Sequence, residues 1–178
     1  MKRIPLIIDT DPGIDDAVAI ALALYSDDID VRLITTVSGN VGIEATTTNA
    51  LKLLAYFGKD VPVARGASEP LIRAAQDASD IHGATGMEGF DFPEPKRELL
   101  MERNAIDAMR DVLMKSEEPI TIMPIGPLTN IALLLKAYPE VKARIERIVL
   151  MGGSVTRGNK GVMAEFNIYV DPEAAKIV

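Results

Sequence analysis

Four carboxylates stand within eight positions near the start of the chain, in the segment DTDPGIDD at positions 9–16. They follow directly on the apolar run 4–8, which has the composition of a strand. Like charges at this spacing repel each other, and burial makes the charged forms still less favourable. The usual relief is a bound cation, and an all-oxygen cluster suits a hard one such as calcium or magnesium. The segment therefore predicts a metal or substrate site.

Part of the segment has simpler interpretations. Asp15 or Asp16 alone could cap the helix that follows, and Asp11-Pro12-Gly13 has the composition of an ordinary turn. One helix needs only one cap, so capping does not account for all four carboxylates. We therefore interpret the cluster as functional, because buried charges must be paired or coordinated.

Short β-rich runs alternate with longer helical patterns along the chain. Strands are expected at 4–8, 31–37, 61–64, 120–125 and 148–151, and helices at 16–25, 43–57, 104–114 and 128–137. This alternation predicts one α/β domain over residues 1–178, with a mostly parallel sheet flanked by helices. The helix at 16–25 is almost wholly apolar, so we expect it to be buried on most sides. Residues 66–97 have no sustained period, which is typical of a functional loop.

The C-terminal segment begins like a helix, with Asp171 as its N-cap and Pro172 in its first turn. Only two turns fit before Val178. A helix that begins and does not continue leads us to expect a domain truncated at its C-terminus.

Polar residues also follow other predicted strands. Ligands in open parallel sheets bind beyond the carboxyl ends of the strands, and Asn40, the Gly126-Pro127 turn and the Gly152-Gly153 pair all stand there. Asn40 could instead be a left-handed turn residue beside Gly39. The glycine pair lacks the spacing of a dinucleotide fingerprint, so it favours a turn or close packing.

Two further polar groups are candidates for the same site. Glu165 and Asn167 alternate around Phe166 and would point the same way if this segment is extended, with Asn159 in the preceding turn. The alternative is an edge strand with its polar residues outward. His82 is the one histidine and stands in a glycine-rich loop, where it is either functional or merely solvated.

Composition excludes several classes of protein. The net charge of −7 argues against a nucleic-acid partner, and the absence of cysteine excludes disulfides and thiolate metal sites. The first apolar run is too short for a secretion signal, and no run reaches the ~18 apolar residues of a membrane span. We therefore expect a soluble, cytoplasmic protein with no membrane partner.

Several segments together resemble one known family. Beside DTDPGIDDA, they are TTVSGN at 35–40, HGATG at 82–86, IGPLTN at 125–130, VLMGG at 149–153 and AEFN at 164–167. In this order they resemble the inosine-uridine-preferring nucleoside hydrolases, among them the bacterial non-specific ribonucleoside hydrolases. The likeness spans essentially the whole chain, and it implies the fold of that family.

The resemblance implies hydrolysis of the N-glycosidic bond of ribonucleosides to ribose and a free nucleobase, with calcium assisting the attack of water. Asp11 would bind calcium and act as the catalytic base. Asp16 and the main-chain carbonyl of Ile125 would complete this chain's share of the calcium ligands. The other implied residues would bind the substrate: Asp15 and Asn40 at the ribose hydroxyls and water, Asn159, Glu165 and Asn167 at the 5′ and 3′ hydroxyls, Met151 beside the sugar, and His82 near the base. The family also implies a role in purine and pyrimidine salvage and a homo-oligomer, a dimer or a tetramer.

The chain departs from the family in length. Family members are longer, and their C-terminal part supplies one more calcium-binding aspartate beside a histidine near the leaving base. We therefore expect the isolated 178-residue chain to be weakly active or inactive.

Two other functions stay open at this point. Asp9 and Asp11 could form the D-x-D motif of a haloacid-dehalogenase-like phosphotransferase, with Asp9 as the nucleophile and magnesium bound. That alternative leaves Asp15, Asp16, Glu165 and Asn167 without a role. The chain could also be a non-catalytic module that binds ribose or nucleosides.

Overall fold

A single parallel sheet forms the centre of the molecule. The computed structural model describes residues 2–76, 78, 83 and 85–178. Within them, five strands lie in the order β3-β2-β1-β4-β5, and every neighbouring pair is parallel. The strands are β1 (Ile4–Thr10), β2 (Ile29–Thr36), β3 (Val63–Arg65), β4 (Ile120–Pro124) and β5 (Ile145–Ile148). The prediction of a mostly parallel α/β fold is confirmed.

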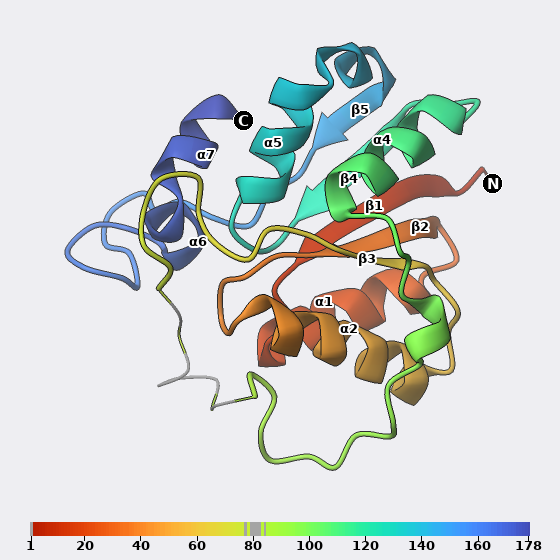
Figure 1. Cartoon of the computed structure of the whole chain (residues 1–178), viewed down its shortest axis with the longest axis horizontal. Helices are drawn as coiled ribbons and strands as arrows, with labels where there is room; N and C mark the ends of the chain where they lie inside the picture. Colours follow the sequence, from red (N-terminus) through yellow and green to blue (C-terminus); the bar gives the residue numbers. More distant parts are fainter. Residues whose placement is uncertain (1, 77, 79–82, 84) are drawn as a thin grey trace.

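Helices cover both faces of this sheet (Figure 1). Helices α1 (Ile14–Tyr25) and α2 (Ile43–Phe57) lie on one face, and α4 (Ala105–Lys115) and α5 (Thr129–Ala137) lie on the other. Each face has its own buried apolar cluster, centred on Ile8 on the first side and on Ile122 on the second. The core therefore has two layers, separated by β1, which the topology places in the middle of the sheet.

Two short helices follow β5. They are α6 (Phe166–Val170) and α7 (Pro172–Ile177), and α7 packs against α5. Asp171 caps α7, as predicted, because its Oδ1 accepts from the backbone N–H of Ala174 at 3.0 Å. Its Oδ2 accepts from the N–H of Leu71 and from the hydroxyl of Thr129. This buried carboxylate thereby joins the segment after β3 and α5 to the C-terminal helices.

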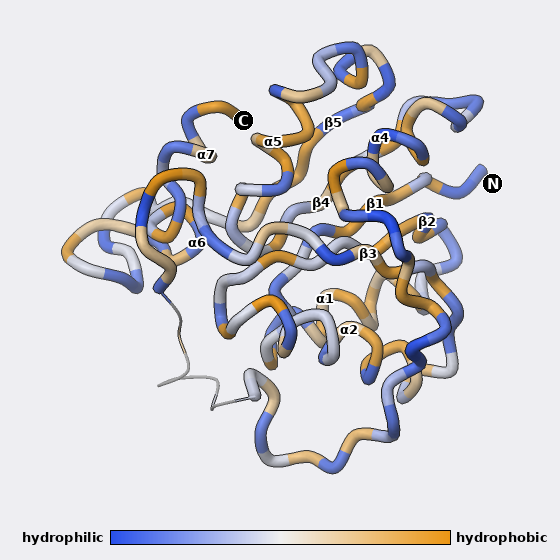
Figure 2. The backbone as a smooth tube through the Cα atoms, viewed as in Figure 1, coloured by the Kyte–Doolittle hydropathy of each residue, from blue (hydrophilic) through white to orange (hydrophobic). Residues whose placement is uncertain are grey.

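The prediction that α1 is buried on most sides was wrong. Only Asp16, Ile20 and Ala23 are buried, whereas Leu22 is 70% exposed and Val18 60% exposed. Figure 2 shows that much of α1 has the orange of apolar residues. The helix is apolar, but the described residues cover only one side of it.

Two further predicted elements differ in the structure. The last strand runs over Ile145–Ile148 rather than 148–151, although the N–H of Met151 still donates to the carbonyl oxygen of Pro124 at 2.9 Å beyond the end of the strand. The segment around Phe166 is not extended, since Glu165 is the N-cap of α6. In addition, Asn40 is no left-handed residue, because no described residue other than glycine has a positive φ.

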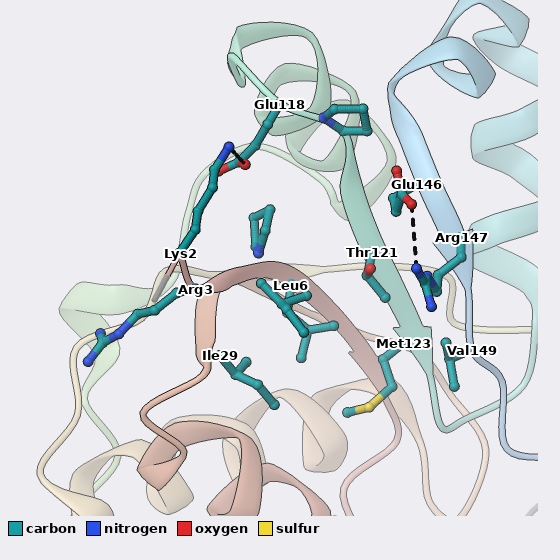
Figure 3. A pocket seen from close by; sticks show the side chains of 13 residues that line it. Lys2, Arg3, Leu6, Ile29, Glu118, Thr121, Met123, Glu146, Arg147 and Val149 are labelled. Atoms are coloured by element: carbon teal, nitrogen blue, oxygen red, sulfur yellow. Dashed lines mark hydrogen bonds and ion pairs between the residues drawn. The ribbon is translucent and has the colours of Figure 1, made fainter.

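A groove crosses the amino-terminal half of β1 and β4 on the side of α1 (Figure 3). It has a volume of about 600 Å³, with Leu6 and Met123 among its lining residues. The Lys2–Glu118 and Glu146–Arg147 ion pairs stand along it. In the described ranges no helix is both long enough and apolar enough to cross a membrane.

Candidate active site

A polar cavity of about 100 Å³ lies at the carboxyl ends of the strands. Eight of the residues that the sequence singled out line it: Asp15, Asp16, Asn40, Ile125, Met151, Asn159, Glu165 and Asn167. Asp11 does not line it, but its carboxylate accepts a hydrogen bond from the backbone N–H of the lining residue Asn40. The structure thus brings together every predicted site residue except His82, which lies outside the described residues.

Asp11 is almost completely buried, at 1% exposure. Burial raises the pKa of its carboxyl well above the usual range, and the neighbouring charges of Asp16 and Asp15 raise it further. The hydrogen bond from the backbone of Asn40 opposes this rise. The charged form of Asp11 is therefore unfavourable unless a positive charge lies nearby. This is expected for a group that holds a metal or accepts a proton.

Asp16 is held at the start of α1. Its Oδ1 accepts from the hydroxyl of Thr10 at 2.7 Å, and its Oδ2 accepts from the N–H of Gly13 at 3.0 Å. The second bond is the capping interaction that the simpler interpretation predicted. Capping and a site role are compatible, because Asp16 also lines the cavity beside Asn40.

Asn40 connects the ends of two adjacent strands. Its backbone N–H donates to Oδ2 of Asp11 at 2.7 Å. Its side-chain amide donates to the carbonyl oxygen of Asp11 at 3.0 Å and to Oδ2 of Asp16 at 3.3 Å. The loop after β2 thereby fixes the orientation of the acidic segment after β1.

Two glycines leave room for the Asp11 carboxylate. A Cβ on Gly126 would lie 2.6 Å from Oδ1 of Asp11, and a Cβ on Gly39 would overlap Oδ2. Any other residue at either position would displace the carboxylate or the backbone. The Asp11 carboxylate is therefore the steric reason why glycine stands at positions 39 and 126.

Asn167 organises the opposite side of the cavity. Its Nδ2 donates to the carbonyl oxygen of Ile125 at 2.9 Å and to that of Met151 at 3.1 Å. Since a carbonyl has two lone pairs, the oxygen of Ile125 keeps one that can bind a cation or a hydroxyl.

Glu165 and Asn159 prepare the start of α6. The carboxylate of Glu165 accepts from the N–H of Asn167 at 3.0 Å, and Oδ1 of Asn159 accepts from the N–H of Phe166 at 2.8 Å. The ammonium of Lys160 lies 5.5 Å from the centroid of the Phe166 ring and also lines the cavity. Lys160 was missed from the sequence, since nothing in its neighbours distinguishes it from a solvated lysine.

Asp9 lies near the end of β1, two residues before Asp11, but it does not line the cavity. It is fully buried, and its Oδ1 accepts from Thr35 at 2.5 Å and from Asn130 at 2.8 Å. Burial raises its pKa to about 7, although these two hydrogen bonds oppose the rise. Its Oδ2 has no partner among the described residues. Such a side chain cannot reach a phosphate ester, which argues against the phosphotransferase alternative.

The described residues contain no group of three or more histidine, cysteine, aspartate or glutamate side chains arranged to hold a metal. They do offer two adjacent carboxylates, Asp11 and Asp16, and the carbonyl oxygen of Ile125. Oxygen donors of this kind fit calcium, which takes six to eight of them, often including water and ligand oxygens. Burial first, and repulsion from Asp16 and Asp15 second, raise the pKa of Asp11, and a cation here would offset both effects.

Fold and site together define an α/β protein with an acidic, amide-lined cavity at the carboxyl ends of its parallel strands. The family model described as inosine-uridine preferring nucleoside hydrolase matches residues 6–178. The chain belongs to this family, and the membership excludes the phosphotransferase alternative.

Relatives and solved structures agree with this assignment. The chain is 58% identical over 173 residues to the non-specific ribonucleoside hydrolase RihC of Klebsiella pneumoniae, covering 97% of this chain and 57% of that one. It is 55% identical over 176 residues to RihC of Escherichia fergusonii, covering 99% and 58%. The purine-preferring ribonucleoside hydrolase from Gardnerella vaginalis superposes with a TM-score of 0.91 at 36% identity, over 97% of this chain and 56% of that one. The chain thus spans a little over half the length of the curated relatives it matches.

Proposed function

We propose that the protein hydrolyses the N-glycosidic bond of ribonucleosides, releasing ribose and a free nucleobase. The observation that carries the proposal is the convergence of the carboxylates Asp11, Asp15 and Asp16 with the amides of Asn40 and Asn167 around one small cavity. Family membership supports the same reaction. Paired acceptors and amide groups are what the hydroxyls of a ribose require.

Calcium is the cofactor that we propose, held by Asp11, Asp16 and the carbonyl oxygen of Ile125. When bound, it would supply a positive charge that holds water and the ribose diol together, and it acidifies water only weakly. Proton removal then falls to a side chain. Asp11 is our candidate, because its carboxylate lies beside the cavity, oriented by the hydrogen bond from Asn40, and a carboxylate next to bound water can accept its proton.

The bond changes of the proposed reaction balance with water alone. As the bond between C1′ and the base nitrogen breaks, its electron pair stays on the nitrogen, which takes up a proton. Asp11 accepts a proton from water, the hydroxide oxygen bonds to C1′, and Asp11 then returns its proton to solvent. The sugar passes through an oxocarbenium-like state, and nearby carboxylates stabilise its positive charge. Asp15 and Asn40 would hold the ribose hydroxyls during this step.

The other cavity residues would bind and orient the rest of the sugar. Asn159, Glu165 and Asn167 would bind the 5′ and 3′ hydroxyls, Met151 would line the sugar pocket, and His82 would stand near the base. We further propose a homo-oligomer, a cytoplasmic location and a role in nucleoside salvage, as the family resemblance implies.

The direct test uses the protein as its gene encodes it, incubated with inosine or uridine in calcium or in excess chelator. Equal amounts of ribose and free base, formed only with calcium, are expected. Tight nucleoside binding without any product would instead favour a non-catalytic binding module. The 178-residue chain, assayed in parallel after its intact mass is verified, should be weakly active or inactive, and substantial turnover would contradict that expectation.

A further inference from the structure

Asn130 is a wholly buried residue in the first turn of α5. It does not line the cavity, yet its side-chain amide makes three hydrogen bonds. Nδ2 donates to Oδ1 of Asp9 at 2.8 Å and to the carbonyl oxygen of Thr36 at 2.9 Å, and Oδ1 accepts from the N–H of Ala67 at 2.9 Å. One side chain thus connects α5 to β1, to the end of β2 and to the segment after β3.

Gly66 makes room for this junction. A Cβ at Gly66 would overlap both polar atoms of the Asn130 amide and the carbonyl oxygen of Thr36. The amide is therefore enclosed on this side, and its position is fixed by packing as well as by hydrogen bonds.

Two of the segments that Asn130 contacts, β1 and β2, lead into the site. Asp9 is followed two positions later by Asp11, and Thr36 is followed four positions later by Asn40. On its own chain segment, Asn130 comes five positions after Ile125, whose N–H donates to the carbonyl oxygen of Asp9 at 2.8 Å.

We propose that Asn130 is a positioning residue of the active site: it holds the Ile125 carbonyl in register with the Asp11 carboxylate and Asn40. The inference rests on the proposed function and deepens it. Asn130 acts through the ends of β1 and β2 rather than on substrate. Its amide suits the task because it combines two donors and one acceptor in one plane.

Substitutions at this position separate the parts of the junction. Asn130→Ala removes all three hydrogen bonds. Asn130→Asp keeps the shape but loses both donors and sets a second carboxylate against Asp9. Residues that orient the groups around a metal typically change metal affinity or activity by about 10- to 100-fold when they are substituted.

The adjacent residue provides a matched control. The hydroxyl of Thr129 donates at 2.7 Å to Oδ2 of Asp171, another fully buried carboxylate, but this bond points towards α7. Thr129→Val therefore removes a buried hydrogen bond of the same kind without touching the strand ends that lead into the cavity.

The experiment compares these variants in the protein as its gene encodes it. Melting temperature without calcium, calcium affinity by calorimetry, and kcat and KM for inosine are measured well below the lowest melting temperature. All three variants should melt earlier than the wild type. Only the two Asn130 variants should also lose about tenfold or more in calcium affinity and in kcat, with KM changed much less.

A second pair of variants covers the case in which the Asn130 variants do not fold. Gly66→Ala displaces the amide without deleting a polar group, and Gly42→Ala adds a methyl group that meets nothing within 4 Å. Gly66→Ala should weaken calcium binding as the Asn130 variants do, and Gly42→Ala should not.

Other outcomes overturn one proposal or both. If the Asn130 or Gly66 variants only melt earlier, as Thr129→Val does, and keep wild-type calcium affinity and kcat, Asn130 is structural and the inference fails while the proposed function stands. If the wild type binds calcium without cleaving nucleosides, the proposed function fails, and calcium affinity alone decides on Asn130. A wild type that does neither rejects both.

Discussion

The backbone N–H of Asn40 donates a 2.7 Å hydrogen bond to Oδ2 of Asp11, while the Asn40 side-chain amide donates to the carbonyl oxygen of the same residue. The loop after β2 therefore forms hydrogen bonds to both the side chain and the main chain of the acidic segment after β1. Two neutral donors, the backbone N–H and the side-chain amide of Asn40, thus hold a buried acidic residue in one orientation. Such preorganisation suits a base that must face a water molecule at a fixed distance.

Substitution of Asp11 tests this arrangement most directly. Asp11→Asn keeps the size of the side chain but removes the proton acceptor and one negative charge. We expect kcat for inosine to fall by about a hundredfold or more, which is the usual contribution of a general base, and calcium affinity to fall as well. Asp11→Ala should abolish turnover in the protein as its gene encodes it. Retention of even about a tenth of the wild-type activity would reject Asp11 as the base, because loss of a general base lowers the rate by about a hundredfold or more.

The close approach of Gly39 to Asp11 leads to a second prediction. Gly39→Ala places a methyl group against Oδ2 of Asp11 and against Pro127, so the carboxylate must move. We expect calcium affinity to fall by about tenfold or more, as measured by calorimetry. Gly42→Ala in the same loop is the control, since its methyl group meets nothing within 4 Å. Equal affinities for the two variants would show that the position of the carboxylate is not critical.

Much of the architecture was predictable from local patterns. The helix expected at 43–57 is α2 (Ile43–Phe57), because its apolar spacing is regular and Gly58 adopts the left-handed conformation that ends it. The acidic segment was placed at the correct edge of the sheet, because the carboxyl ends of parallel strands share one edge.

The remaining errors have physical causes. The predicted position of β5 was three residues too late, because the exposed Glu146 and Arg147 interrupt the apolar pattern of the strand. Helix α6 was missed because five residues are too few to display a helical period. The exposure of α1 could not be foreseen, since composition records how apolar a helix is and not what covers it.

The buried junction of Asn130 with Asp9 was also not predicted. Asn130 belongs to the segment IGPLTN, but neither its spacing nor its type indicated a bond to a residue 121 positions away. Contacts of this range depend on how strands are ordered in the sheet, which local periodicity does not determine. A buried carboxylate without an assigned role, such as Asp9, was the one available signal.

Asp9 gives a prediction on pH. Its pKa is raised from 3.8 to about 7 in the folded chain, so the folded state binds this proton more tightly than the unfolded state. The resulting stabilisation is complete below the ordinary pKa and is lost as the pH rises through about 7. The difference in pKa corresponds to roughly 4 kcal/mol. Calcium-free protein should therefore become less stable between pH 4 and pH 7, as followed by urea unfolding.

Two variants identify the group responsible. Asp9→Asn keeps an acceptor for Thr35 and Asn130 but cannot titrate, so its unfolding free energy should fall less across this range than that of the wild type. The share due to Asp11, whose pKa burial also raises, should remain. Asp107→Asn is the control, because the hydrogen bond from Tyr138 lowers the pKa of Asp107 and its titration falls below the range. An unchanged pH profile in Asp9→Asn would assign the effect to another group.

Asn167 offers a test of the opposite wall of the cavity. Asn167→Asp preserves the shape of the side chain but removes the donors to the carbonyl oxygens of Ile125 and Met151, and it adds a carboxylate beside Glu165. Two acceptors then lose their partner, and the Ile125 carbonyl is no longer held in place. Because the Ile125 carbonyl is a proposed calcium ligand, kcat/KM for inosine should fall by about 10- to 100-fold, the usual effect of losing a group that orients a metal ligand. Asn104→Asp is the matched control, since Asn104 caps α4 at an exposed position where aspartate caps equally well. If both variants retain wild-type kcat/KM, the amide of Asn167 does not organise the site.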